Sequence, residues 1–395
     1  MRRPATVRTP AIPLSASSDQ TRMQDDLFFD PDAEPAPKPG PARSGAGAST
    51  APTTASMAEP AAAAPGKKAK GGNLGVGPAE IKAEHVELAS KLPPLFRMGT
   101  SSWSYPGWAD LVWDGEYSES MLAKHGLDAY GHHPLMRAVG IDRGFYRALT
   151  SVQFARYAAQ VPDDFRFIVK APSAVADAMV RNENGRSMQA NPLFLDPRLA
   201  EQEFIQPALT GLGHKIGALV FQLSPLPSNL LRQMPFVLER LHAMLRGLTK
   251  LAPVAPEGTV AVEVRDPAFL TPEFSAVLRD VGAIYCLCLH PKMPPIHEQL
   301  PLLRSLWPGP FVCRWNLNRR HGAYGYEDAQ SEYAPYDRLQ DPDLDTRDTL
   351  AKVIAGTTSR GQRAYVTISN KAEGCAPLSV VALAQAVAAA ASLDS

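Results

Sequence analysis

The run IGALVFQL, residues 216–223, decides how this chain folds. It is apolar on both faces of an extended strand, which is typical of strands buried in a parallel sheet between helices. Seven further runs share this character, and most are rich in β-branched residues. They are LFRMG (95–99), RAVGID (137–142), FRFIVK (165–170), TVAVEV (259–264), AIYCLCL (283–289), FVCRWNL (311–317) and RAYVTISN (363–370).

Helical segments separate several of these runs. The segment SNLLRQMPFVLERLHAMLRGL has apolar residues at helical spacing. It can line one face with Leu231, Phe236, Leu238 and Leu241. A second helix is predicted to begin at Thr271, which is a good N-cap residue followed by Pro272 at the first helical position. Between the first two runs the composition predicts only a ragged helix.

Eight buried strands that alternate with helices in one domain predict an α/β fold, a (β/α)8 TIM-like barrel over residues 95–392. A doubly wound open sheet is the alternative fold. It lacks support, because no GxGxxG or GxxxxGK[ST] motif follows any of the strands.

Residues 1–85 form a predicted disordered tail, since a segment so rich in Ala, Pro, Gly, Ser and Thr lacks the apolar surface that offsets ordering entropy. Within it, residues 24–28 (QDDLF) resemble the Q-x-[S/D]-L-F pentapeptide by which bacterial replication and repair proteins dock onto the DNA sliding clamp. Leu27 and Phe28 would fill one apolar pocket while the amide of Gln24 hydrogen-bonds nearby. A chance match in the tail is the alternative.

Charge and cysteine content narrow the class of protein. Forty basic and forty acidic residues balance, so no global field draws the chain onto nucleic acid or an anionic membrane. The start MRRPATVRTP has no apolar signal region, and no apolar run is long enough to span a bilayer. The cysteines are too few and scattered for a disulfide framework, which predicts buried, reduced thiols at Cys286, Cys288, Cys313 and Cys375. We therefore expect a soluble, cytoplasmic protein without membrane contact.

Polar residues follow nearly every predicted strand. In a (β/α)8 barrel these strand ends meet at one rim, where the active site lies. They supply Thr100, Ser101 and Ser102; Asp142 and Arg143; Lys170; Gln222; Glu263, Arg265 and Asp266; Arg314 and Asn316; and Ser369, Asn370 and Lys371. Since buried charges without a use are costly, the set favours a functional pocket. A structural ion pair of Glu263 with Lys170 or Arg314 is the alternative interpretation.

The loop GTSSWSYPGWAD, residues 99–110, places large aromatic side chains in a polar turn at this rim. We expect Trp103, Tyr105 and Trp108, together with Tyr146 after the second strand, to form a wall on which a sugar or base ring stacks. The alternative is that these aromatic residues cap the end of the barrel beneath the following loop.

Six segments in this order resemble the DUF72 (YecE-like) family: GTSSWSYPGW, FYRALT, FRFIVKAP, LVFQLSP, AVEVRDPAF and SNKAEGCAP. The resemblance runs from about Arg97 to the C-terminal region. It implies a TIM-barrel fold and no established biochemical activity. The positions that match the family pattern are Gly99, Thr100, Ser101, Trp103, Tyr105, Trp108, Phe145, Tyr146, Lys170, Pro172, Gln222, Pro225, Glu263, Arg265, Arg314, Asn370, Gly374 and Pro377.

The chain departs from the family pattern at several positions. Where the family usually reads VEIN-S-TFY, this chain has Gly140 in place of the glutamate and Asp142 in place of the asparagine. Asp266 replaces a frequent histidine, and the family's RLHG element reads RWNL at residues 314–317. If activity in other members needs the lost glutamate, this chain has altered chemistry or none.

The leading functional hypothesis is a hydrolase-type enzyme for a small anionic, ring-bearing substrate such as a phosphosugar or a nucleotide. Glu263 and Asp142 would be the general acid and base, and Lys170 is a third candidate catalytic residue. Arg265 and Arg314 would bind the anionic group together with the lysine, because a guanidinium presents a bidentate fork. The substrate would be oriented by Gln222 and Asn370.

No cofactor is predicted. An alternative version of this hypothesis is a metal-dependent enzyme in which a divalent ion takes part in catalysis. The strand ends supply carboxylates at Glu263, Asp142 and Asp266, but only His290 and His321 lie near the rim. A magnesium ion held mainly by substrate and water would fit such a thin ligand set.

The alternative class is a non-catalytic protein that binds nucleic acid or a metabolite and is tethered to the sliding clamp through Gln24, Leu27 and Phe28. The tail motif favours a DNA-linked role. The neutral net charge counts against a large DNA footprint.

Overall fold

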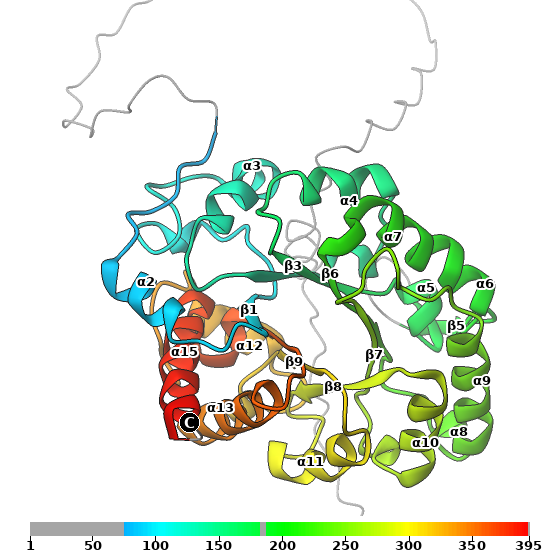
Figure 1. Cartoon of the computed structure of the whole chain (residues 1–395). Coiled ribbons are helices and arrows are strands. Elements are labelled where there is room, and N and C mark those ends of the chain that lie inside the picture. Colours follow the sequence, from blue (N-terminus) through cyan, green and yellow to red (C-terminus); the bar gives the residue numbers. More distant parts are fainter. Residues whose placement is uncertain (1–74, 182–186, 394–395) are drawn as a thin grey trace, which may run out of the picture.

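The computed structural model describes residues 75–181 and 187–393, and eight parallel strands in it close into a barrel (Figure 1). The order around the barrel is β1-β10-β9-β8-β7-β6-β3-β2. The strands are β1 (Phe96–Thr100), β2 (Ala138–Ile141), β3 (Arg166–Lys170), β6 (Ile216–Gln222), β7 (Thr259–Glu263), β8 (Ile284–Leu289), β9 (Phe311–Trp315) and β10 (Ala364–Ile368). Each predicted strand is present, so the (β/α)8 fold class is confirmed and the open sheet is excluded.

Helices surround the barrel on the outside (Figure 1). The longer ones are α2 (Ala83–Ser90), α3 (Glu119–Gly131), α4 (Ser151–Ala158), α7 (Gln206–Leu212), α9 (Met234–Arg246), α10 (Pro272–Val281), α11 (Ile296–Ser305), α12 (Tyr326–Tyr333), α13 (Leu344–Thr358) and α15 (Ala376–Leu393). Single turns are α5 (Ser173–Ala176), α6 (Pro197–Ala200), α8 (Ser228–Leu231) and α14 (Asn370–Glu373). A short antiparallel pair, β4 (Met179–Arg181) and β5 (Ser187–Ala190), lies between β3 and α6 and was not predicted.

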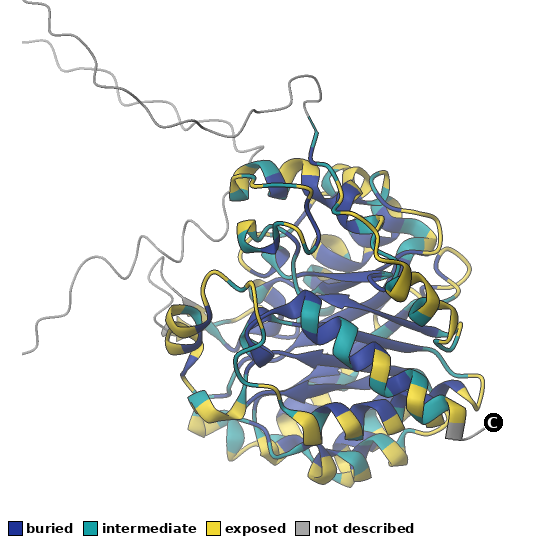
Figure 2. Cartoon of the chain, turned by 90° about the vertical axis from the view of Figure 1, so that its left-hand side faces the viewer, coloured by how far each residue is buried: buried dark blue, intermediate teal, exposed yellow. Residues whose placement is uncertain are grey.

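Two apolar layers hold the barrel together. Mostly small and medium side chains, together with Tyr365, fill the inside of the ring, and a larger cluster lies between the strands and the helices. The inner residues are Ala138, Ile168, Ala218, Val220, Ala261, Ile284, Cys286, Val312 and Tyr365. Figure 2 shows the strands almost wholly buried beneath helices that expose one side. Both faces of the strands are therefore covered, which explains their continuous apolar sequence.

The helix predicted from residue 228 is interrupted after Leu231 and resumes as α9. In α9, Leu238 and Leu241 are buried as predicted, but Phe236 is 46% exposed. Val237, Met244 and Leu245 complete the buried face instead, so the apolar stripe is shifted from the predicted one. The start of α10 is confirmed, since the Thr271 side chain accepts a hydrogen bond from Phe274 N.

The folded domain begins earlier than predicted. Residues 75–85 were assigned to the tail, yet Val76 is buried and Gly77 N donates to the hydroxyl of Tyr117. Ala79 N also donates to the carbonyl of Val112. The tail boundary at residue 85 is therefore too late, because these contacts join the segment to the core. The predicted docking motif at residues 24–28 lies outside the described residues.

Two further sequence predictions concern the cysteines and the membrane. All four cysteines are free and buried, as predicted. None of the helices within residues 75–181 and 187–393 combines the length and apolarity that crossing a bilayer requires.

Candidate functional site at the barrel mouth

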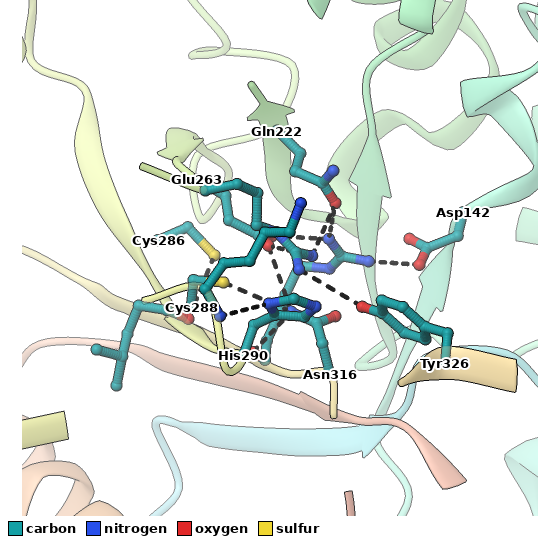
Figure 3. A network of polar contacts seen from close by, with 12 residues as sticks. Asp142, Gln222, Glu263, Cys286, Cys288, His290, Asn316 and Tyr326 are labelled. Carbon is teal, nitrogen blue, oxygen red and sulfur yellow. Dashed lines mark hydrogen bonds and ion pairs between the residues drawn. The ribbon is translucent and has the colours of Figure 1, made fainter. Parts of the chain in front are cut away.

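Charged and amide side chains gather at the C-terminal ends of five strands (Figure 3). We call this set the mouth cluster. It consists of Asp142 after β2, Lys170 at the end of β3, Gln222 at the end of β6, Glu263 and Arg265 at and after the end of β7, and Arg314 in β9. The predicted convergence of residues far apart in the sequence is therefore observed for these six residues.

Glu263 lies at the centre of the mouth cluster and is fully buried. Its Oε2 lies 2.7 Å from Arg314 Nη1, and its Oε1 lies 2.8 Å from Arg265 Nη2. Burial alone would raise the pKa of Glu263, but the charges of the two arginines outweigh this effect and lower it to about 2. Glu263 is therefore an ionised carboxylate with both oxygens occupied. This geometry suits the orientation of two guanidinium groups better than proton transfer near neutral pH.

Arg314 connects the two carboxylates of the mouth cluster. Its Nη2 forms an ion pair with Asp142 Oδ2, and its Nη1 donates to Gln222 Oε1 at 3.1 Å as well as to Glu263. Arg265 Nη2 donates to the same amide oxygen at 3.2 Å. Gln222 is thereby fixed between two guanidinium groups. Because Arg314 is only 2% exposed, a ligand could reach it only by displacing one of these partners.

Lys170 differs from the other charges of the mouth cluster. Its Nζ lies 3.6 Å from the centre of the Phe145 ring, and among the described residues it has no hydrogen bond or ion pair. Burial lowers the pKa of Lys170 to about 7, with Arg314 and Arg265 acting in the same direction and Asp142 opposing them. A large fraction of this amine is therefore neutral at physiological pH.

Two residues from other elements complete the polar environment. The hydroxyl of Tyr326, at the start of α12, accepts a hydrogen bond from Arg265 Nη1 at 3.4 Å. The ring of His290, after β8, packs against this tyrosine, and its Nδ1 accepts a hydrogen bond from Lys292 N. Burial, together with the charge of Arg265, lowers the pKa of His290 to about 3. This imidazole is therefore neutral.

Several buried polar atoms near the strand ends have no hydrogen-bond partner among the described residues. They include Ser101 Oγ, Asp142 Oδ1, Arg265 Nε, His290 Nε2 and Thr367 Oγ1. Buried polar groups are normally paired, and an unpaired one costs about 1–3 kcal/mol. A set of such atoms at one end of the barrel is consistent with a place where water or a ligand completes the hydrogen bonding.

The aromatic loop after β1 is packed more tightly than a ligand wall requires. Trp108 is fully buried, stacks with Trp113 and donates from Nε1 to Asn370 Oδ1 at 3.2 Å. No face of this ring is open, so Trp108 caps the barrel end as the alternative interpretation held. Trp103 is also buried, with only 5% of its surface exposed.

The two tyrosines of the predicted aromatic wall are more exposed than its two tryptophans. Tyr105 is half-buried between Trp108 and Tyr336, with ring centroids 4.9 Å and 5.5 Å away. Tyr146 is 65% exposed beside Phe145, whose ring covers Lys170. Of the four predicted wall residues, Tyr146 is therefore the one best placed to meet a ring-bearing ligand.

Asn370 lies at the same end of the barrel but outside the charged network. Its Oδ1 accepts hydrogen bonds from Trp108 Nε1 and from Ala376 N at 2.8 Å. The oxygen thus joins the β1 loop to the start of α15. Its Nδ2 is buried and has no partner among the described residues. The structure therefore gives Asn370 a structural role through these two hydrogen bonds, and its role in binding substrate stays a prediction.

Three of the departures from the family pattern have structural consequences. A Cβ at Gly140 in β2 would lie 2.7 Å from the carbonyl oxygen of Ser101, so the backbone directly after β1 leaves no room for a side chain there. Asp266 does not point into the network, because its Oδ2 accepts a hydrogen bond from Leu226 N at 2.8 Å and so fixes the loop after β6. Of the two substituted acidic residues, Asp142 alone joins the mouth cluster.

The candidate metal ligands are engaged with protein partners. Within the described ranges no group of three or more His, Cys, Asp or Glu side chains is arranged to hold a metal ion. Glu263 and Asp142 pair with arginines, and Asp266 binds a backbone N–H. His321, in the loop after β9, packs against Tyr333, and its Nδ1 lies 4.0 Å from Glu332 Oε2. The residues present do not form a preorganised metal site.

Sequence reasoning missed two members of the polar environment. Cys288 Sγ accepts a hydrogen bond from Asn316 Nδ2, and this amide also reaches Glu263. Since Cys286 points into the barrel, the strand period of two would have placed Cys288 inward as well. No sequence signal identified Tyr326, because it comes from a helix rather than from a strand end.

A closed ring of eight parallel strands with a charged C-terminal mouth defines a (β/α)8 barrel of the TIM type. The sequence model of the family described as "Protein of unknown function DUF72" matches residues 97–394, so the chain belongs to this family.

Solved structures of two family members are similar to this chain. A DUF72 family protein of Enterococcus faecalis V583 is 14% identical, with 74% of this chain and 95% of that chain covered and a TM-score of 0.46. A DUF72 family protein of Thermotoga maritima MSB8 is 17% identical, with 73% and 98% covered and a TM-score of 0.46. A comparison with curated proteins found no match.

Proposed function

We propose that the barrel mouth is the active site of a hydrolase-type enzyme for a small anionic substrate that carries a ring, such as a phosphosugar or a nucleotide. The observation that carries this proposal is that the amine of Lys170 has no hydrogen-bond or ion-pair partner among the described residues, whereas the neighbouring arginines are paired with carboxylates. The mouth is the end of the fold at which TIM barrels conduct their chemistry.

The charge balance of the mouth cluster supports an anionic ligand. Three cations, Lys170, Arg265 and Arg314, face two carboxylates, Glu263 and Asp142. The carboxylates are paired with the arginines, so the excess positive charge falls on the lysine. A phosphate or carboxylate next to the amine would neutralise this excess and satisfy its N–H donors.

The acid–base groups of this proposal differ from the predicted pair. Glu263 stays ionised and holds the arginines, so it acts as a positioning residue. Lys170 and Asp142 remain as the groups that can exchange a proton with substrate or water, because the amine is partly neutral and Asp142 Oδ1 has no described partner. The exposed ring of Tyr146 offers a surface for a sugar or base.

Anion binding to the purified protein tests this proposal. Phosphate and a small dicarboxylate are titrated by calorimetry into wild type, Lys170→Met and the control Lys215→Met. Lys215 is a half-buried lysine at the opposite end of the barrel, where its Nζ donates to two backbone carbonyls. We expect Lys170→Met to weaken binding roughly tenfold or more, since the loss of one charge-assisted hydrogen bond is worth about 1.5–3 kcal/mol.

Two results would contradict the anionic site. Equal binding by Lys170→Met and wild type would place the anion elsewhere, and equal losses in both lysine variants would indicate a general effect of charge. Hydrolysis of phosphosugar or nucleotide substrates by wild type, lost in Lys170→Met, would identify the reaction class.

A second proposal rests on the tail motif. We propose that Gln24, Leu27 and Phe28 dock the chain onto the bacterial sliding clamp, which would bring a nucleic-acid or metabolite site to the replication machinery. A pull-down with the clamp compares wild type with Leu27→Ala/Phe28→Ala. The double variant Ile12→Ala/Leu14→Ala, in the same tail, is the matched control. Retention of the clamp by the first variant would remove the argument for tethering.

A further inference from the structure

Lys170 has the environment of a nucleophilic amine. Its Nζ lies 3.6 Å from the centre of the Phe145 ring and has no hydrogen bond or ion pair with any described residue. Lysines that attack carbonyl carbon are activated by desolvation and by neighbouring cations, because both disfavour the ammonium form. Here Arg265 and Arg314 supply the neighbouring cations.

We propose that Lys170 is the nucleophile of this site and that its Nζ adds to the carbonyl carbon of a small anionic aldehyde or ketone, forming an imine. The inference rests on the proposed function, because the mouth must first hold the anionic group. It also narrows the substrate to compounds that carry both a carbonyl group and a negative charge. The first attacking atom is then the lysine nitrogen. The water molecule that is lost as the imine forms is taken up again when the imine is hydrolysed, which frees the amine.

The step balances without an oxidant or a reductant. The nitrogen lone pair forms the C–N bond while the carbonyl π electrons move to oxygen, and a proton passes from nitrogen to oxygen to give the carbinolamine. Loss of this oxygen as water breaks the C–O bond and leaves the imine. Asp142 can carry the protons, since it follows β2 beside β3 and its Oδ1 has no described partner.

The charges around the amine agree with this role. The groups that act on Lys170 are Asp142, Arg314, Arg265 and Glu263, and burial with the two arginines lowers the pKa of Lys170 to about 7. At pH 7 about half of such an amine is neutral, compared with about one in 2,500 for an ordinary lysine of pKa near 10.4. This difference should separate Lys170 from surface lysines in a labelling experiment.

Reductive trapping tests the imine. Full-length protein is incubated with pyruvate, glyoxylate or glyceraldehyde 3-phosphate and with cyanoborohydride, and the adducts are located by intact mass and peptide mapping. Acetone is the uncharged control for pyruvate. We expect one dominant adduct on Lys170, formed at least tenfold faster with pyruvate than with acetone, since a charge-assisted hydrogen bond is worth about 1.5 kcal/mol or more.

Variants and pH sharpen the readout. Lys170→Arg keeps the positive charge without a nucleophilic amine, so it should lose the adduct, whereas Lys215→Arg should keep it. Labelling of Lys170 in wild type should rise between pH 6 and 8 and then level off, because the neutral amine is the reacting form. Inorganic phosphate should slow the labelling by competing for the mouth.

The outcomes separate this inference from the proposed function. If none of the three carbonyl compounds labels Lys170 faster than surface lysines, while phosphate still binds wild type better than Lys170→Met, the imine is wrong and the anionic site stands. If phosphate shows no such preference and no adduct forms on Lys170, both proposals are wrong.

Discussion

The two ends of the barrel carry clusters of the same residue types that are built in different ways. At the N-terminal end, which we call the bottom cluster, Glu257 lies among Arg97, Arg166 and Arg363. Its Oε2 is 3.1 Å from Arg166 Nε and 3.7–3.8 Å from the other two guanidinium groups. At the mouth, Glu263 lies between two arginines and close to a lysine. Both clusters therefore hold more cations than carboxylates.

The partners of the cations distinguish the two ends. At the bottom, Arg97 Nε donates to the carbonyl of Asp164, and Arg166 Nη1 donates to the carbonyls of Asp163 and Phe165. Backbone oxygens thus accept several of the arginine hydrogen bonds, while Arg97 Nη1 and Arg363 Nε have no hydrogen-bond partner among the described residues. The Glu257 side chain keeps 26% exposure to water. At the mouth, Glu263 is 0% exposed and the amine of Lys170 has no described partner.

An excess of positive charge is therefore not sufficient to identify a site in this barrel. The bottom cluster closes the strand ends through backbone contacts and solvent, as expected for the end of a TIM barrel that serves stability. The mouth cluster buries Glu263, Arg265 and Arg314 and leaves Lys170 without a hydrogen-bond or ion-pair partner among the described residues. Such a residual charge is costly unless a ligand uses it.

Replacement of the central glutamate of each cluster by glutamine should change the free energy of unfolding by very different amounts, and the larger of the two changes is the largest effect that we predict. Glu263→Gln leaves the buried Arg265 without a carboxylate and Arg314 with Asp142 alone, so we expect it to lower the free energy of unfolding by about 3–5 kcal/mol. Glu257→Gln removes a solvent-accessible charge, and we expect a loss of about 1 kcal/mol or less. Urea denaturation measures both changes, with an unchanged m-value as the check on two-state unfolding.

Equal losses in these two variants would break the comparison, because they would mean that burial does not distinguish the clusters. A loss in Glu257→Gln larger than that in Glu263→Gln would assign the larger structural contribution to the bottom cluster and would contradict the expected effect of burial at the mouth.

The barrel could be predicted from the sequence because its strands carry a strong local signal. A run such as residues 216–222 is apolar on both faces, and only a sheet covered on both sides buries both. The β4–β5 pair carries no such signal, since two of its described side chains, Gln189 and Ala190, are exposed. Phe236 was misplaced for a related reason, because helical periodicity fixes the spacing of a stripe but not which neighbour covers it.

The positions of the candidate site could also be predicted, but the roles of its residues could not. Strand ends converge in a closed barrel, which correctly brought Glu263, Lys170 and Arg314 together. Whether a carboxylate transfers protons or holds arginines depends on distances across the ring, which a sequence does not contain. For the same reason Trp108 could not be recognised as a buried cap before its contact with Asn370 was known.

A smaller effect than that of Glu263→Gln is expected when the two half-buried lysines are compared. The folded protein holds the pKa of Lys170 at about 7, below its ordinary value near 10.5, because burial disfavours the ammonium group. Below pH 7 the folded state carries the full cost of this charge, and the cost declines as the pH rises towards 10.5. Lys170→Met should therefore be more stable than wild type by about 1–3 kcal/mol at pH 6, after allowance for solvent screening, with a smaller gain at pH 9.

The control variant Lys215→Met loses two hydrogen bonds to the carbonyls of Ala158 and Val161, so it should be less stable than wild type at both pH values. Denaturation of the three proteins at pH 6 and pH 9 measures these differences, and destabilisation by Lys170→Met at pH 6 would mean that the lysine is a structural charge like those at the bottom of the barrel.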